Sequence, residues 1–196
     1  MIERVLSRKN VKPAARITVK TLISAGIVLL AALLPQFIHL VSGAEGGAKW
    51  LPMYLPVLLG GCLLGWRWGL AVGILSPLVS FGFTSLTGNP MPAAVRLPYM
   101  AAELAVFAAV SGLFSAKISE NGWMAFPAVL LAQVSGRVCF AALAFVFQGV
   151  SSLTFAAAWA QIQAGLPGLF AQAVLVPFIV MGMRLLLIRD EKREEK

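Results

Sequence analysis

Chemically reactive side chains are scarce in this sequence. Its 196 residues include one histidine, two cysteines and eight carboxylates. With His39 alone, neither a histidine metal site nor a histidine proton relay is supplied. Cys62 and Cys139 fall inside apolar segments, where cysteine acts as a small packing residue, and they indicate neither a disulfide nor a metal site. We therefore expect no metal and no other cofactor.

Sequence motifs of hydrolysis are missing as well. No Walker phosphate-binding loop occurs, and Ser111-Gly112 and Ser135-Gly136 lack the surrounding pattern of a nucleophile elbow. The apolar segments contain no second acidic residue that could pair with Glu103 in hydrolysis. The sequence therefore predicts that the protein is not an enzyme and that any energy for its work comes from other proteins.

Charge is also sparse, and apolar residues take its place. Charged residues make up 12% of the chain, hydrophobic residues make up 59%, and the mean hydropathy is +0.85. One bilayer crossing needs about 20 mainly apolar residues, so the chain has room for about six crossings and no attached soluble domain. We predict an all-α integral membrane protein, a compact bundle of about six transmembrane helices. The six apolar segments are 23–41, 51–66, 69–86, 96–116, 124–148 and 162–188.

The charged ends define the expected domain organisation. Residues 1–20 form a basic cytoplasmic segment, residues 21–188 the six-helix membrane domain, and residues 189–196 a charged cytoplasmic tail. A cleaved secretory signal is the competing interpretation of the first apolar segment, because residues 41–44 include small residues, but the run is longer than a signal core. No repeat with a period of about 20 to 50 residues occurs, so the six helices are expected to form one unit.

The net charge of +8 is distributed as in a membrane protein, and we expect no nucleic acid as a partner. Basic residues lie in the tails and in short connections beside apolar segments. With the N-terminal segment in the cytoplasm, Arg67, Lys117 and the C-terminal tail fall on the cytoplasmic side too. Only Lys49 and Arg96 then lie near the outside. We expect a multi-pass protein of a prokaryotic cell membrane, with both termini in the cytoplasm.

Two ionisable residues, Glu103 and Arg137, lie well inside predicted helices. Burying either without a partner would cost several kcal/mol. In the predicted orientation Glu103 lies about two helical turns below the outer surface and Arg137 lies near mid-membrane, so the two can meet. Two interpretations stay open, a structural ion pair that locks two helices and a polar site for a substrate.

Other polar and aromatic residues gather in the outer halves of the predicted helices. A small-molecule site combines aromatic faces with a few fixed donors and acceptors, although Trp and Tyr are also ordinary residues of the membrane interface. A cup that opens to the outside would use such a set. The candidate substrate-binding residues are Glu103, Arg137, Trp50, Tyr54, Asn89, Arg96, Tyr99 and Gln133, and His39, Gln148, Gln161 and Gln163 lie in the same outer half.

Small residues recur every four positions in three of the segments. This spacing lets helix backbones approach closely, either inside the bundle or at a docking face for another membrane subunit. The spacing alone is compatible with packing inside the bundle and with a docking face. The residues concerned are Gly61, Gly65, Gly69 and Gly73, together with Ala101 and Ala105.

Several short motifs form one pattern that resembles a known family. They are LPVLLGG at residues 55–61, GWRWG at 65–69 and TGNPMP at 87–92, in a chain with a basic N-terminal segment and six expected helices. Over about residues 20–187 the chain resembles the substrate-binding S components of energy-coupling-factor transporters.

The resemblance implies a function and a set of partners. An S component captures a vitamin or related micronutrient at the outer side of the membrane. It then associates with a membrane coupling subunit and two cytoplasmic ATPase subunits, which power release of the substrate inward. The first, third and fifth connections would cover the binding cavity, with Trp50, Asn89 and Arg96 at its rim.

Two alternatives and one question about charge stay open. The chain can instead be a six-helix membrane scaffold protein without a small-molecule substrate, or a small intramembrane enzyme that uses Glu103, Arg137 and His39. If Arg96 or Arg137 faces the cavity without a protein carboxylate, an anionic ligand is favoured. If Glu103 faces it alone, a cationic or donor-rich ligand is favoured.

Overall fold

The computed structural model describes residues 1–8, 12–86, 88, 90–149 and 153–194, and this part of the chain is helical without strands. Six helical stretches are long and apolar enough to cross a membrane, so the predicted all-α membrane fold is confirmed. They are Pro13–Gly43, Glu45–Leu64, Trp66–Leu86, Ala94–Leu113, Gly122–Val146 and Leu166–Leu187. The elements are α1 (Ile2–Arg8), α2 (Pro13–Trp50), α3 (Tyr54–Leu64), α4 (Trp66–Leu86), η1 (Ala94–Arg96), α5 (Leu97–Leu113), α6 (Ser115–Glu120), η2 (Gly122–Met124), α7 (Ala125–Val146), α8 (Phe155–Ala164) and α9 (Leu166–Glu194).

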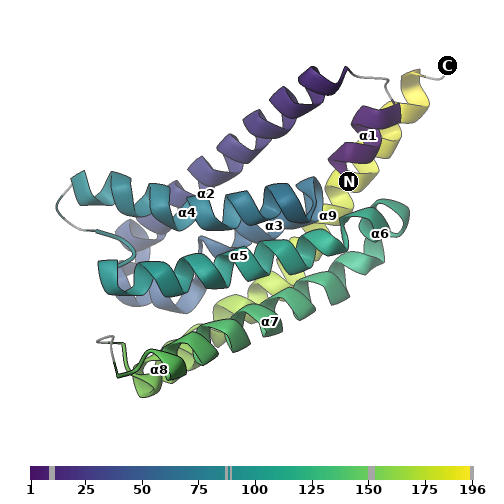
Figure 1. Cartoon of the computed structure of the whole chain (residues 1–196). Helices are drawn as coiled ribbons and strands as arrows, with labels where there is room; N and C mark the ends of the chain where they lie inside the picture. Colours follow the sequence, from purple (N-terminus) through teal and green to yellow (C-terminus); the bar gives the residue numbers. More distant parts are fainter. Residues whose placement is uncertain (9–11, 87, 89, 150–152, 195–196) are drawn as a thin grey trace.

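Helix α5 lies at the centre of the bundle, where it packs against α3, α4 and α7 (Figure 1). Helix α9 packs against α7 and α3. The N-terminal half of α2 extends away from the other helices (Figure 1), and it exposes large apolar side chains such as Leu22, Leu29 and Leu33. In a bilayer this apolar face meets lipid or another membrane protein.

The bundle has two chemically different ends. At one end, which we call the basic end, α1, α6 and the C-terminal part of α9 lie together (Figure 1), and Arg4, Lys20 and Arg67 line a shared hollow. At the opposite end lie α8 and the connection between α4 and α5, with Arg96 beside Gly47 in a second hollow. Arg67 and Arg96 thus lie at opposite ends of the bundle, as the sequence predicted.

The N-terminal part of the chain differs from the sequence prediction. Helix α2 begins at Pro13, so Arg16 and Lys20 belong to its first turns and not to a separate tail. Lysine and arginine are good helix formers whose long side chains can reach the membrane surface, and they therefore continue the helix. Residues 42–50, which separate the first two predicted apolar segments, are helical except at Gly43, whose φ of 67° and ψ of −170° break the helix.

The segment after Gly43 turns back closely on the segment before it. A Cβ atom on Gly46 would lie 2.3 Å from the Cβ of Ser42, and one on Gly47 would lie 2.4 Å from Nε2 of His39. At Gly46 a side chain would collide with Ser42, and at Gly47 it would displace the ring of His39. The tight reversal makes residues 45–50 the beginning of the second membrane crossing, and it brings His39 and Gly47 to the same hollow.

The glycine ladder packs helices inside the bundle. A Cβ on Gly61 would lie 2.4 Å from the carbonyl oxygen of Ala108, and one on Gly73 would lie 2.4 Å from that of Leu104. Gly69 is closed off in the same way by Ala108 and Gly61. These glycines let α3 and α4 approach the backbone of α5, so they are not free to form the docking face that was one of the two expectations.

The remaining members of the small-residue pattern fit the same account. Ala105 is 9% exposed and its Cα lies against Gly73. Ala101 is half-buried on the same helix, α5. Gly65 ends α3 with a φ of 87°, a left-handed conformation that favours glycine, and it allows the sharp turn into α4. The structure therefore assigns the pattern to packing and to a turn.

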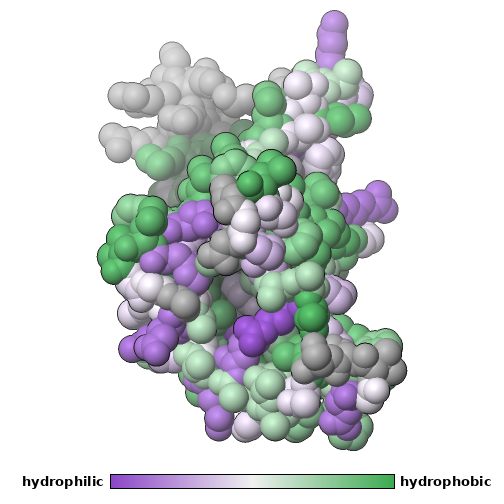
Figure 2. Space-filling view, turned by 90° about the vertical axis from the view of Figure 1, so that its left-hand side faces the viewer, coloured by the Kyte–Doolittle hydropathy of each residue, from purple (hydrophilic) through white to green (hydrophobic). Residues whose placement is uncertain are grey.

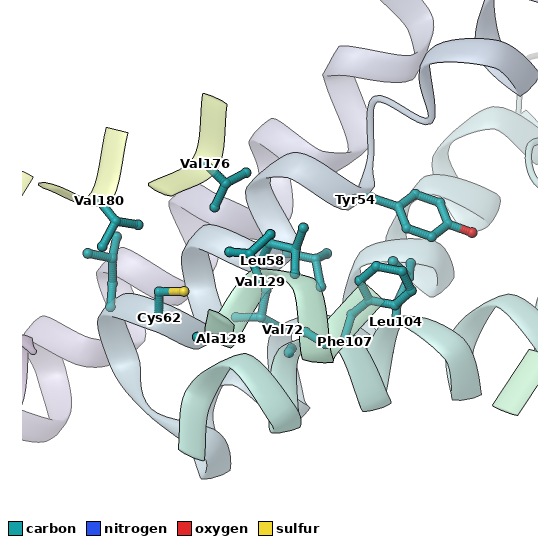
Figure 3. Close-up of a cluster of buried hydrophobic side chains, with 14 of the residues drawn as sticks. Tyr54, Leu58, Cys62, Val72, Leu104, Phe107, Ala128, Val129, Val176 and Val180 are labelled. Carbon is teal, nitrogen blue, oxygen red and sulfur yellow. The ribbon is translucent and has the colours of Figure 1, made fainter. Parts of the chain in front are cut away.

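The core is a cluster of aliphatic side chains from α3, α4, α5, α7 and α9 (Figure 3). Val176 and Val180 of α9 face Leu58 and Cys62 of α3 across it (Figure 3). At one side of the cluster the ring of Tyr54 packs edge-on against Phe107, with centroids 5.1 Å apart. The hydroxyl oxygen of Tyr54 points away from the aliphatic side chains (Figure 3), so the apolar core ends there.

Helix α8 was not expected from the sequence, since most of it lies between the predicted fifth segment, 124–148, and the sixth, 162–188. Its start is stabilised by Thr154, whose side-chain oxygen accepts a hydrogen bond of 3.2 Å from the backbone N–H of Ala157. A threonine N-cap before an Ala-rich run is a recognisable helix signal. The helix places Gln161 at the same hollow as Arg96.

Candidate small-molecule cavity

A cavity of about 280 Å³ lies at the end of the bundle opposite the basic end. Figure 2 looks onto this end, where hydrophilic and apolar residues are intermixed. Three connections contribute to its walls: residues 43–53, which include the break at Gly43 and the turn into α3 and are called the α2–α3 reversal below, the α4–α5 connection, and α8. Its described lining residues are Pro35, His39, Gly47, Ala48, Leu51, Pro52, Met53, Tyr54, Ser80, Met91, Pro92, Ala93, Arg96, Met100 and Gln161.

Tyr54 forms part of the cavity floor and connects it to the interior of the bundle. The residue is 1% exposed, and its hydroxyl donates a hydrogen bond of 2.6 Å to Oε2 of Glu103. A hydrogen bond to a carboxylate is stronger than one between neutral groups. The bond therefore fixes the orientation of the tyrosine ring beneath the cavity.

Glu103 and Arg137 form an ion pair beneath this floor. Oε1 of Glu103 lies 3.0 Å from Nη1 of Arg137, with the glutamate side chain fully buried and the arginine side chain 9% exposed. The guanidinium also lies over the ring of Tyr54, 5.1 Å from its centroid. The structure thus supports the ion-pair interpretation, and neither charged side chain is among the lining residues of the cavity.

Arg137 reaches from α7 toward the start of α9. A Cβ on Gly165 would lie 3.3 Å from its Nη2 atom, so the missing side chain at this position leaves room for the guanidinium. The three guanidinium nitrogens have no hydrogen-bond partner within the described part of the chain. The ion pair with Glu103 and the contact with the Tyr54 ring are therefore the interactions that offset burial of the arginine charge.

The connection between α4 and α5 is held over the cavity at Met91. The side chain of Ser80 donates a hydrogen bond of 3.0 Å to the carbonyl oxygen of Met91, and Thr84 accepts one of 2.7 Å from its N–H. Sequence reasoning missed both residues. The sequence signal that could have indicated them is a pair of hydroxyl side chains near the end of a membrane helix that is followed by a Pro-rich connection.

Two lining side chains offer polar groups to the cavity. The side chain of Arg96 has no hydrogen bond or ion pair within the described chain, and Oε1 of Gln161 is buried without a hydrogen-bond partner there. Buried polar atoms in proteins nearly always have a partner. These two groups can therefore contact a polar molecule in the cavity.

Several predicted site residues lie away from the cavity. Tyr99 packs against Phe140 in a second apolar cluster, with ring centroids 6.4 Å apart. Gln133 donates a hydrogen bond of 3.0 Å to the carbonyl of Leu169 and so joins α7 to α9. Trp50 is 44% exposed, with the ammonium of Lys49 over its ring. Asn89 lies outside the described residues.

Gln172 is a structural residue that the sequence did not suggest. Its side-chain amide donates to the carbonyl oxygens of Trp50 and Leu51, at 3.0 and 2.9 Å. Leu51 has a left-handed conformation with a φ of 49°, so these bonds hold a strained turn next to the cavity. Gln172 therefore ties α9 to the α2–α3 reversal.

The hollow at the basic end has a different character. It is larger, about 770 Å³, and four of its charged side chains form two ion pairs, while Arg67 lies over the ring of Trp66. Arg4 lies 3.7 Å from Glu120, and Lys20 is paired with Glu3. Because both carboxylates of this hollow are already used in ion pairs and its charges lie at an open surface, it is a weaker candidate for a ligand site than the cavity beside Arg96.

The fold and the six apolar helices define a multi-pass α-helical membrane protein. No protein-family model, no curated protein and no solved structure matches the chain. Among the described residues, no group of three or more His, Cys, Asp or Glu side chains is placed to hold a metal ion. What the protein does must therefore be argued from the cavity itself.

Proposed function

We propose that the chain is a substrate-capture subunit, an S component of an energy-coupling-factor importer, for a vitamin or related small micronutrient at the cell membrane. The observation that carries this proposal is the cavity of about 280 Å³ at the end opposite the basic residues. Cytoplasmic ends of membrane proteins carry the excess of Lys and Arg. By that rule the cavity opens to the outside.

The walls of the cavity suit reversible capture of a small molecule. They combine apolar side chains such as Met53 and Met100 with a few polar groups, which is the usual composition of small-molecule sites. The α2–α3 reversal, the α4–α5 connection and α8 meet over it. These are the first, third and fifth connections, which cover the substrate in the family that the sequence resembles.

Energy for inward release would come from partners. The sequence has no Walker motif, which fits a subunit that works with a membrane coupling subunit and two ATPase subunits. The glycine ladder is used inside the bundle, so a membrane partner needs another surface. The exposed apolar face of α2 around Leu29 and Leu33 is the candidate, because Pro13–Gly43 is the least buried of the six apolar spans.

Thermal unfolding of the purified protein in detergent tests the proposal. A panel of water-soluble vitamins and their precursors is added one at a time. A ligand at 100 times its dissociation constant stabilises by about 2.7 kcal/mol. We expect one compound or one related group to raise the unfolding midpoint.

Two variants distinguish capture in the cavity from general effects of the additive. Met100→Trp fills the cavity and should abolish the shift. Val134→Trp adds the same ring on an exposed face of α7 and should leave it unchanged. If no compound raises the midpoint of the wild-type protein, the six-helix scaffold without a small-molecule substrate is the better account.

A further inference from the structure

We propose that the cavity selects a small organic monoanion whose carboxylate is bound by Arg96. This inference rests on the proposed function, since it names the chemical class of the captured molecule. The inference depends on two observations: one charged side chain, Arg96, lines the cavity, and the nearby charges of Glu103 and Arg137 neutralise each other outside it.

Arg96 is the one formally charged side chain among the described lining residues of the cavity. It follows the α4–α5 connection at the end of η1, directly before α5. The polar side chains that accompany it are those of His39, Tyr54, Ser80 and Gln161. A guanidinium is a planar donor fork that matches the two oxygens of a carboxylate.

No carboxylate among the described residues forms an ion pair with Arg96. Six of the eight lie at the basic end or in the sequence of the C-terminal tail: Glu3, Glu120, Asp190, Glu191, Glu194 and Glu195. Of the other two, Glu45 is exposed and is not among the lining residues. Glu103 is buried beneath the floor, where Arg137 and Tyr54 hold it.

The same arrangement limits the ligand to one negative charge. Arg137, the second arginine on this side of the core, is paired with Glu103 and does not line the cavity. Lys49 lies over the ring of Trp50 and does not line it either. One unpaired cation therefore faces the ligand, and a dianion would leave one charge without a protein partner at the edge of the membrane.

The rest of the lining describes the body of the ligand. Its apolar walls come from three methionines and three prolines, and methionine adapts to rings and chains alike. Oε1 of Gln161 is buried and unpaired, so the ligand carries a second polar group that can donate to it. A cavity of about 280 Å³ lies at the small end of the range for ligand sites, about 300–1,000 Å³. The ligand is thus a single small ring or a short chain with one carboxylate. The wall residues are Met53, Met91, Met100, Pro35, Pro52 and Pro92.

Isothermal titration of the purified protein tests this class. The probes are the monoanionic, neutral and cationic members of the vitamin panel, and for each monoanion its primary amide, which has nearly the same shape without the charge. We expect a monoanion to bind and its amide to bind at least about tenfold more weakly, since each tenfold corresponds to about 1.4 kcal/mol.

Substitutions at Arg96 test the residue that makes the contact. Arg96→Gln should weaken binding of the monoanion by about 10- to 100-fold, because it removes a charge-assisted hydrogen bond. Arg96→Lys keeps the charge without the fork and should give a smaller loss. Arg67→Gln, at the basic end, should change nothing. Arg96 is exposed, and the unliganded unfolding midpoint of its variants should equal that of the wild type.

Three other outcomes are possible, and they contradict the ligand class, the role of Arg96 or the proposed function. If a neutral or cationic compound binds and Arg96→Gln leaves its affinity unchanged, the ligand class is wrong, while capture by the cavity stands. If a monoanion binds equally well to wild type and Arg96→Gln, the role of Arg96 is wrong. If no member of the panel binds, the proposed function fails and the ligand class fails with it.

Discussion

Glu103 on α5 and Arg137 on α7 meet inside the bundle, with Oε1 and Nη1 3.0 Å apart. Both side chains are at least nine-tenths buried, so each depends on the other for neutralisation of its charge. Because the pair lies directly beneath Tyr54, it also supports the floor of the cavity. The pair thus lies beneath the cavity and is not part of its lining.

Removing one member of this pair should be more harmful than removing both charges. Arg137→Met leaves Glu103 buried and unpaired, and we expect it to destabilise the protein by about 3–5 kcal/mol. In Glu103→Gln/Arg137→Met the cost should be smaller by about 1–3 kcal/mol, because no unpaired charge remains. Unfolding titrations in mixed detergent measure both values.

The control for the ion pair is Arg67→Met, an exposed position at the start of α4, which should shift stability by less than about 0.5 kcal/mol. Equal destabilisation by the single and double variants would mean that the two charges do not depend on each other.

The hydroxyl of Tyr54 should contribute measurably to stability. Tyr54→Phe removes the 2.6 Å hydrogen bond to Glu103 while it keeps the ring contact with Phe107. A hydrogen bond to a charged group contributes about 1.5–3 kcal/mol, and we expect a loss of that size in the same unfolding titration. Tyr99→Phe is the matched control, since no hydrogen bond of its hydroxyl occurs among the described residues, and a similar loss there would argue against the assignment.

Two glycines of α4 should respond in opposite ways to alanine. At Gly73 a Cβ would lie 2.4 Å from the carbonyl oxygen of Leu104, so Gly73→Ala forces α4 and α5 apart and should cost about 1–3 kcal/mol. At Gly82 a Cβ would meet nothing within 4 Å. Gly82→Ala should be neutral or stabilising by up to about 1 kcal/mol, because alanine favours the helix. Equal effects on the unfolding free energy would contradict the packing assigned to Gly73.

The sequence was sufficient for the parts of the fold that depend on composition and charge. Apolar runs gave the six crossings, and the isolation of Glu103 and Arg137 in apolar segments suggested that they meet, because an unpaired charge at that depth is costly. The distribution of Lys and Arg separated Arg67 from Arg96. These features depend on how each residue type partitions between lipid and water, so they can be predicted without knowing how the helices pack.

Contacts between distant residues could not be obtained in this way. A ladder such as Gly61 to Gly73 has the same spacing whether it faces α5 or another subunit, and only the packed bundle distinguishes the two. The roles of Tyr99 and Gln133 depend on which helix each side chain meets. Helix α8 was missed because its Thr154 cap follows an uncharged stretch that resembles a loop.

The central claim is that the cavity opens to the outside, where it can capture a nutrient. Single cysteines at exposed Ala93, beside the cavity, and exposed Ala116, at the basic end, test it in a Cys62→Ala/Cys139→Ala background. A membrane-impermeant maleimide is added to intact cells that express each variant. We predict that Ala93→Cys reacts in intact cells and that Ala116→Cys reacts only after permeabilisation. The reverse pattern would mean that the cavity opens into the cytoplasm, and capture from outside would be contradicted.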